Sequence, residues 1–398
     1  MNEKIIRFFT RFNWISFAAM LALVALGTLT IYSAGNARDE AVFHDMWRAN
    51  LHTAVFGLVL YFVLAAVDYR RFLDYFSWPL YAGAVILLVA VLVFGSTVYG
   101  GRRWLWFFQP SEISKLCLLV LMAALLGDGE SWFARLRPTF RGFLTVGMLV
   151  GVPCLLILLE PDLGTTLTLV PAVMVMMFAA GVWWRGFTIL VTVGAVLALA
   201  VLGAVYEAER PGATPERRAK ILKYLPLKEH QVSRVRVFLF PEEDLQGSGY
   251  NLRQAKIAIG SGGYVGKGFQ RGETNHLKYL PPSVSMNDFI FCVYAEERGY
   301  RGSILLLSLF LALILPCCWV AHRATDDRGR LLALGVSTLV FAHVYINIAM
   351  SIGLLPITGL PLPFISSGRT FLVTVMCGLG LVQSVAIHRD PAAPSLDR

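Results

Sequence analysis

Charged residues are scarce in this sequence. Only 15% of its 398 residues are Asp, Glu, Lys or Arg, while 56% are hydrophobic. A soluble domain carries about 25% charged residues, so the composition excludes an ordinary soluble fold. The long apolar runs also lack alternation with period two, which excludes a β-barrel and indicates helices. The sequence therefore predicts an all-α membrane protein with several spans.

Motifs for metal or nucleophilic chemistry are missing as well. All six cysteines lie inside apolar runs without CxxC spacing, so we interpret them as small core residues rather than disulfides. There is no HExxH motif and no catalytic-triad spacing. A metal ion, Mg²⁺ or Mn²⁺, would need oxygen ligands such as Asp288, Glu112 or Asp162.

The basic residues are dispersed. The net charge is +9, but no patch of Lys and Arg is present. This pattern argues against nucleic acid as a partner and favours anionic membrane lipid or a phosphate-bearing substrate.

Ten apolar stretches approach the 17 to 25 residues, roughly, that a membrane-spanning helix needs. We therefore expect one integral membrane domain over residues 1–398, with a large loop at 207–288 between the seventh and eighth spans. The predicted spans are 12–33, 49–67, 77–95, 111–127, 142–159, 163–183, 186–206, 289–320, 331–353 and 371–387.

The short loops give an orientation. If the N-terminus is cytoplasmic, thirteen Lys and Arg residues, from Lys4 to Arg389, lie on the inner side and five, from Arg38 to Arg369, on the outer side. Because basic residues accumulate in cytoplasmic loops, we expect both termini inside and the 207–288 loop outside. The unusual polar motifs then all fall on the outer side.

Asp288 is the leading candidate among these polar residues. It stands where the long loop meets the eighth span, and an ionisable group at the membrane edge is costly unless it is paired or functional. Two interpretations remain open from the residues alone: a helix cap or a catalytic carboxylate. Asp162 in EPDLG has the same alternatives at the start of the sixth span.

Further candidates have equally plain alternatives. Glu112 and Lys115, spaced i, i+3, form either a helical ion pair or a cation presented to phosphate. Trp104 fits an interfacial aromatic belt or a platform for a sugar. Glu296 and Glu297, inside the eighth span, predict a buried pairing network.

The long loop has helical patterns of its own. Residues 217–225 and 250–259 predict short amphipathic helices. The run GSGGYVGKG at 260–268 does not fit a Walker A loop, because Gly268 stands where Ser or Thr is required. It is either a flexible turn or a place where backbone approaches a phosphate or sugar.

Six motifs in order carry a resemblance to a known family. They are GRRW, QPSEISK, EPDLGT, YNLRQAKIAIGSGGYVGKG, the LP…DFIF…EE segment and GLLPITGLPLPFIS. Together they resemble the SEDS family of bacterial wall synthesis, which includes RodA and FtsW, over residues 14–388. The PDLG motif and the Thr in LPITG favour the RodA branch.

This resemblance implies a ten-span peptidoglycan glycosyltransferase of the bacterial cytoplasmic membrane that polymerises lipid II, an undecaprenyl-diphosphate-linked disaccharide peptide, on the outer side. It implies a class B penicillin-binding protein as transpeptidase partner, with further elongation-complex proteins. Asp288 falls on the family's essential aspartate and would be the general base. The residues expected at the substrate and its pyrophosphate are Lys115, Glu112, Asp162, Trp104, Arg102 and Lys256, with Glu296 and Glu297 in support.

Two departures from the family pattern lie close to this site. Met286 and Asn287 replace the His-Thr pair before the aspartate, and Ser367 replaces the tyrosine of the family's ISYGGSS motif. A lipid II flippase, a non-catalytic scaffold and the division-type FtsW paralogue are the alternative functions. A transporter would need polar groups along a path through the midplane, and few are present in the sequence.

Overall fold

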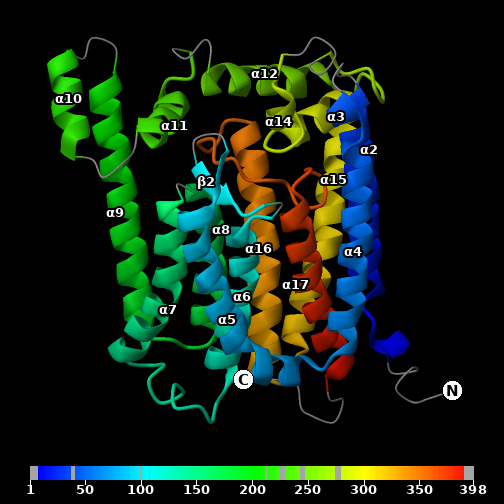
Figure 1. Ribbon diagram of the computed structural model, residues 1–398, viewed down its shortest axis with the longest axis vertical. Coiled ribbons are helices and arrows are strands. Elements are labelled where there is room, and N and C mark those ends of the chain that lie inside the picture. The colour runs from blue at the N-terminus through cyan, green and yellow to red at the C-terminus, as the bar shows by residue number, and fades with distance from the viewer. Residues whose placement is uncertain are drawn as a thin grey trace.

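Long apolar helices run side by side, and short helices lie across one end of them (Figure 1). The structure is a computed structural model, which describes residues 8–36, 41–98, 101–106, 108–160, 162–210, 214–224, 229–242, 247–273 and 279–389. The end of the bundle covered by α11 (Glu229–Leu239), α12 (Ser248–Ser261) and α14 (Pro282–Ser285) is called the loop end below.

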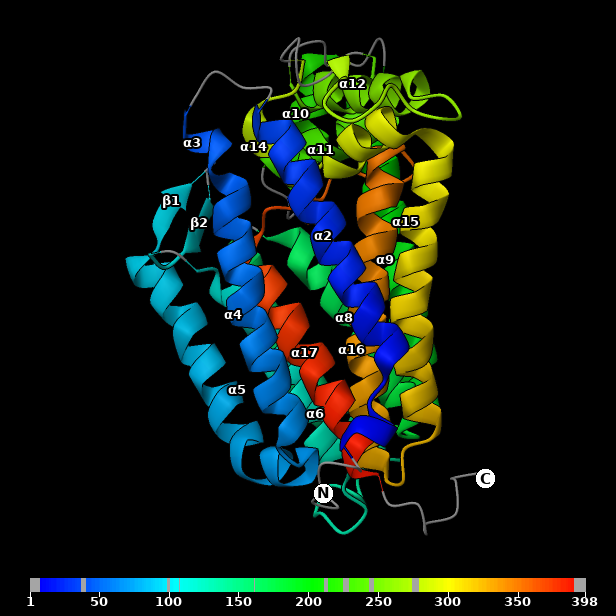
Figure 2. The ribbon, with the colours of Figure 1, turned by 90° about the vertical axis from the view of Figure 1, so that its right-hand side faces the viewer.

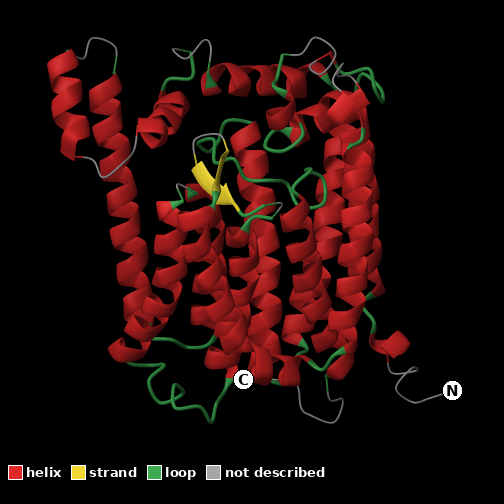
Figure 3. Cartoon of the chain, in the orientation of Figure 1, coloured by secondary structure: helices red, strands yellow, loops and turns green. Residues whose placement is uncertain are grey.

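The remaining elements include the helices that correspond to the predicted spans. They are α2 (Trp14–Asn36), α3 (Ala41–His44), α4 (Met46–Ala66), α5 (Tyr69–Phe94), β1 (Ser96–Val98), β2 (Gly101–Trp104), α6 (Pro110–Gly127), α7 (Phe140–Leu159), α8 (Leu163–Ala179), α9 (Trp184–Glu209), α10 (Pro215–Tyr224), α15 (Ile290–His322), α16 (Asp327–Ser351) and α17 (Arg369–His388). Strands β1 and β2 pair antiparallel and form a small ribbon in an otherwise helical chain (Figure 3).

Within the described ranges, nine helices are long and apolar enough to cross a membrane, and α8, with 17 residues, is a shorter apolar helix. All ten predicted spans therefore correspond to helices. Helix α5 begins at Tyr69, eight residues before the predicted start at 77, because its first two turns are polar and hydropathy does not register them. Large apolar side chains such as Ile86 and Leu199 face outward, as expected of a multi-pass membrane protein.

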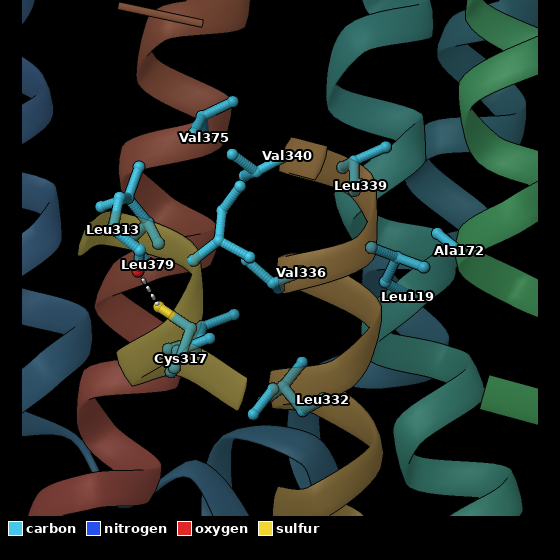
Figure 4. Close-up of a cluster of buried hydrophobic side chains, with 14 of the residues drawn as sticks. Leu119, Ala172, Leu313, Cys317, Leu332, Val336, Leu339, Val340, Val375 and Leu379 are labelled. Carbon is cyan, nitrogen blue, oxygen red and sulfur yellow. Dashed lines mark hydrogen bonds between the residues drawn. The ribbon is translucent and has the colours of Figure 1, made fainter. Parts of the chain in front are cut away.

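Three helices form the inside of the bundle. In the most apolar 18-residue stretch of each helix, 78% of the residues are buried in α6, 72% in α16 and 83% in α17, but only 6% in α9. The inner helices pack with α8 and α15 around a continuous apolar core (Figure 4). Side chains of this core shown in the figure include Leu119, Ala172, Leu313, Cys317, Leu332, Val336, Leu339, Val340, Val375 and Leu379. Helix α9 stands apart and contacts chiefly α10 and α11.

Polar contacts tie the helices together at the end opposite the loop end, which is the end near both termini in Figure 2. Arg11 Nη1 donates to the carbonyl of Ile387 at 3.4 Å, which places the start of α2 beside the end of α17. Arg70 and Asp326 form an ion pair of 2.7 Å between α5 and the turn before α16. The first and last described residues therefore lie at the same end of the bundle, as an even number of crossings requires.

The segment between α9 and α15 contains ordered helices. Helices α10 and α12 lie where amphipathic helices were predicted at 217–225 and 250–259, and residue 225 is outside the described residues. Helix α11 lies between them in the sequence and carries two arginines, Arg234 and Arg236. Its position over the loop end brings residues from the middle of the sequence above the core helices (Figure 1).

Helix α15 is broken at Gly299. This residue has φ 67° and ψ −164°, a conformation accessible to glycine but not to residues with a side chain. The break leaves the carbonyls of Glu296 and Glu297 and the N–H groups of Tyr300 and Arg301 without their helical partners. Buried backbone groups need other partners in their place.

The glycine-rich run supplies all four partners. Its backbone inserts at the break, with Gly266 so close to Glu297 that an added Cβ would lie 2.2 Å from that residue's carbonyl oxygen. The four bonds are Lys267 N–H to Glu296 O (3.0 Å), Gly268 N–H to Glu297 O (3.0 Å), Tyr300 N–H to Gly263 O (2.9 Å) and Arg301 N–H to Tyr264 O (3.1 Å). The glycines are therefore explained by close approach to the chain's own backbone.

Candidate active site

Asp288 lies in the turn between α14 and α15, at the loop end of the bundle. Its backbone carbonyl accepts a hydrogen bond of 2.9 Å from Asn347 Nδ2 on α16, and the same amide group donates to the carbonyl of Leu360 at 2.6 Å. Asn347 is fully buried, so it fixes the turn and the 354–368 loop against the core. Helix α15 is capped by Phe289 without a side-chain bond, so the carboxylate of Asp288 is not a helix cap.

Two serines hold the same turn from the other side. Ser366 Oγ donates to the carbonyl of Asn287 at 2.7 Å, and Ser367 Oγ donates to Asn287 Oδ1 at 2.6 Å. The backbone N–H of Ser367 also donates to the carbonyl of Met286 at 3.1 Å. The turn that carries Asp288 is thus fastened by the loop before α17.

The carboxylate of Asp288 faces the guanidinium group of Arg234 across Gly359. A Cβ added at Gly359 would lie 3.5 Å from Asp288 Oδ2 and 3.7 Å from Arg234 Nη2. Gly359 has φ 73°, so its backbone also requires glycine. Arg234, on α11, is held there by a bond of 3.1 Å from its Nη1 to the carbonyl of Thr358.

The charges around Asp288 oppose one another. Burial raises the pKa of its carboxyl from 3.8 to about 6, Arg234 and Arg103 lower it, and Asp162 raises it. Burial and the neighbouring Arg103 lower the pKa of Arg234. Two cations near two carboxylates, partly shielded from water, form a site suited to an anionic ligand with a base beside it.

Asp162 is held in place by two side-chain contacts at the start of α8. Its Oδ1 accepts from the backbone N–H of Thr165 at 3.1 Å, which is the predicted capping bond. Its Oδ2 accepts from Gln109 Nε2 at 3.1 Å, just before α6. Nearby, Arg103 Nε donates to the backbone carbonyl of Glu160 at 3.2 Å. The QPSE and EPDLG motifs therefore meet at the loop end.

Glu112 and Lys115 form a buried ion pair beneath this site. Lys115 Nζ lies 2.7 Å from Glu112 Oε2 and 2.9 Å from His343 Nε2, and its side chain is fully buried. The ring of His343 stacks on Phe371 at 4.2 Å between centroids. The ammonium group thus faces α16 and α17 inside the bundle, and it is not presented at the surface.

The remaining residues predicted at the substrate are on β2 and α12. Trp104 ends β2, partly buried, and Arg102 is in the same strand but its side chain lies outside the described residues. Lys256 is exposed on α12 and lies against Gly353, where an added Cβ would be 2.4 Å from its Nζ.

Glu296 and Glu297 hold the glycine-rich segment to α15. Glu296 pairs with Lys267 at 2.9 Å, and Glu297 accepts hydrogen bonds from Ser33 Oγ and from the backbone N–H of Gln270. Both side chains are buried. They form the buried pairing network predicted for them, and the contacts described for them stay within that network.

Sequence reasoning missed Arg234, Arg103, Asn347 and Glu160 as site residues. A weak signal existed for Asn347, since a lone amide in an apolar span usually has a polar partner. Arg234 is one of two arginines that alternate with apolar residues at 232–240, and nothing local distinguishes it from Arg236.

The residues at the site do not form a metal centre. Among the residues that the structure describes, no group of three or more His, Cys, Asp and Glu side chains could hold a metal ion. Asp288 has two arginines acting on it, and both oxygens of Asp162 already accept hydrogen bonds. This donor set fits an anion better than Mg²⁺ or Mn²⁺, so no step below is routed through a metal.

Fold and site together define a multi-pass helical membrane protein with a carboxylate–arginine site at one end of its bundle. Residues 13–390 match the model of a family described as cell cycle protein, which comprises FtsW, RodA and SpoVE. The chain belongs to this family, and the resemblance to the SEDS proteins is confirmed.

Curated relatives match over nearly the whole length. The peptidoglycan glycosyltransferase MrdB of Escherichia coli K12 is 34% identical over 383 residues, covering 95% of this chain and 94% of that protein. The peptidoglycan glycosyltransferase RodA of Treponema pallidum is 29% identical over 434 residues, covering 96% and 98%.

Solved structures share the fold. The rod shape determining protein RodA of Thermus thermophilus superimposes with a TM-score of 0.64 at 26% identity, covering 95% of this chain and 97% of that one. A chain from a peptidoglycan synthase complex that coordinates polymerization and crosslinking gives a TM-score of 0.72 at 29% identity, covering 96% and 99%.

Proposed function

We propose that the protein is a peptidoglycan glycosyltransferase that polymerises lipid II into β-1,4 glycan strands for cell elongation. The observation that carries the proposal is the Asp288 carboxylate facing Arg234, with Arg103 acting on both, at one end of a membrane bundle. The names of the curated relatives agree with the glycosyltransferase class.

Asp288 supplies the base for this reaction. The nucleophile is a sugar 4-hydroxyl, which is unreactive until its proton is removed. A carboxyl with a pKa of about 6 is ionised at neutral pH and is a stronger base than an ordinary aspartate. General-base catalysis of this kind contributes a factor of roughly 10²–10⁴ in rate.

The arginines supply the positive charge that the leaving group requires. As the hydroxyl oxygen bonds to the anomeric carbon, its proton passes to Asp288 and the bond to the diphosphate breaks with its electrons. Arg234 and Arg103 neutralise the departing polyprenyl diphosphate. A single displacement converts an α-linked donor into a β-linked product, so no covalent enzyme intermediate is needed.

Lys115 has a different part from the one the sequence suggested. Lys115 is buried and is paired with Glu112 on α6 and with His343 on α16. We propose that these contacts fix α6 and α16 against each other and thereby position the QPSE turn and Asn347. It is a positioning residue, and the loop-end arginines bind the diphosphate in its place.

The orientation of the protein and its partners belong to the same proposal. Thirteen basic residues on one side and five on the other favour cytoplasmic termini in the bacterial inner membrane, with the site outside. A class B penicillin-binding protein is the proposed transpeptidase partner, alongside other elongation proteins. A structural neighbour from a peptidoglycan synthase complex that coordinates polymerization and crosslinking supports that choice.

The test is polymerisation of lipid II by the purified protein. Asp288→Ala should abolish glycan formation and leave the thermal unfolding midpoint unchanged. The matched control is Asp45→Ala, which removes an exposed carboxylate that forms an ion pair with Arg48 and should polymerise normally. Polymer from Asp288→Ala at the wild-type rate would refute the proposal.

Two further measurements separate the alternatives. A flippase would move lipid II across vesicle membranes, and that movement would be lost in Asp288→Ala, while a scaffold would tolerate the substitution in both assays. Addition of EDTA tests the predicted Mg²⁺ or Mn²⁺: if the arginines supply the charge, polymerisation should persist.

A further inference from the structure

Glu160 is a buried carboxyl with no hydrogen-bond partner on either oxygen within the part of the chain that the structure describes. Its side chain is fully buried at the end of α7, in the turn that leads to α8. A buried ionised carboxylate without a partner costs several kcal/mol or more, so the group must either hold a proton or await a ligand.

The surroundings of Glu160 belong to the active site. Asp162, two residues on, and Arg103, from β2, are the charged groups that act on it. Arg103 is anchored to it through the backbone, by the bond from Nε to the Glu160 carbonyl. The same Asp162 and Arg103 also act on Asp288, so Glu160 and Asp288 have these two charged neighbours in common.

Burial and the negative charge of Asp162 outweigh Arg103 and raise the pKa of Glu160 to about 8. The carboxyl therefore holds a proton at neutral pH, when Asp288 is ionised. Two carboxyl groups whose environments separate their protonation states are a recurrent arrangement for paired acid and base roles.

We propose that Glu160 is a further substrate-binding residue, which in its protonated form donates a hydrogen bond to an anionic oxygen of the bound diphosphate. A neutral acid can lie beside a diphosphate where a second carboxylate would repel it. Glu160 would thus add a donor to Arg103 and Arg234 without adding to their positive charge. The proposal rests on the proposed function, because it takes a diphosphate as the ligand.

The test is binding of geranyl diphosphate to the full chain in lipid nanodiscs, measured calorimetrically at pH 7 and pH 9. Affinity of the wild-type protein should fall about tenfold at pH 9, because a group with a pKa of about 8 is then mostly ionised. Glu160→Gln, neutral at both pH values and still a donor, should lose this dependence. Any change in the protonation of geranyl diphosphate between pH 7 and pH 9 affects the wild type and Glu160→Gln equally, so it cancels when the two are compared.

The control is Glu130→Gln, an exposed glutamate at the opposite end of the bundle, which should bind as the wild type does. Wild-type binding that is equal at both pH values, or absent, would overturn the inference without recourse to any variant. So would a pH dependence retained in Glu160→Gln. Binding is measured separately from polymerisation. Failure of the glycosyltransferase proposal would appear in the polymerisation assay, and failure of the Glu160 proposal would appear in the pH dependence of binding.

Discussion

Asn287 and Ser367 are joined side chain to side chain by a hydrogen bond of 2.6 Å, across 80 positions of sequence. These are two positions at which the chain departs from the family pattern, the first beside the aspartate and the second in the loop before α17. Their contact joins the segment before Asp288 to the loop before α17. The bond helps to hold the turn that carries Asp288.

The first prediction concerns this pair. Asn287→Ala and Ser367→Ala should each lower kcat by roughly 2- to 12-fold, which corresponds to the 0.5–1.5 kcal/mol net value of a hydrogen bond. The double variant should be little worse than either single one, because the interaction is lost once. Ser337→Ala, a buried serine bonded within α16, is the control and should retain kcat. Fully additive losses would show that the contact does not position Asp288.

The second prediction concerns the loop-end arginines. Arg234→Ala should lower kcat/KM by about 10²–10³, the usual effect of removing one donor to developing charge. Arg234→Lys should recover only part of this loss, since an ammonium group lacks the guanidinium fork. Arg236→Ala, on the same helix but paired towards Glu209, is the matched control and should remain near wild type. Equal losses at 234 and 236 would indicate a general effect on α11.

The third prediction is a pH dependence. Because Asp288 must be ionised to act as base, kcat/KM should fall below about pH 6, the pKa of its carboxyl. Arg234 lowers that pKa, so Arg234→Gln should raise it and move the acid limb to higher pH. Activity of the variant is measured across pH 5–8 against Arg236→Gln, which should leave the limb in place. An unshifted limb in Arg234→Gln would remove Asp288 as the group that titrates.

The fourth prediction separates stability from chemistry at the buried pair. Lys115→Met leaves Glu112 uncompensated in the core and should destabilise the fold by about 3–5 kcal/mol. The double variant Glu112→Gln/Lys115→Met should recover most of this loss, as measured by the thermal unfolding midpoint. If the double variant unfolds as early as the single one, then Lys115 is not acting through Glu112.

The spans, and the candidate site residues named from the sequence, were found because their signals are local. Hydropathy locates the helices, and Asp288, Asp162 and the Glu112–Lys115 pair are ionisable groups at the edges of apolar runs. Arg234 was not predictable, since its contact with Thr358 spans 124 positions and its neighbours along α11 are similar. Asn347 matters because of its bonds to the carbonyls of Asp288 and Leu360, and Glu160 because its buried oxygens have no hydrogen-bond partner among the described residues. Both facts depend on the folded chain.

The break at Gly299 has a consequence for the design of chimaeras between relatives. The short upper part of α15 follows directly from Asp288, and its backbone is completed by residues 263–268. Exchanging the long loop alone would replace one partner in each of these four hydrogen bonds. The smallest unit that can be exchanged intact therefore runs from the start of α12 through Arg301, so that the loop and the aspartate are transferred together.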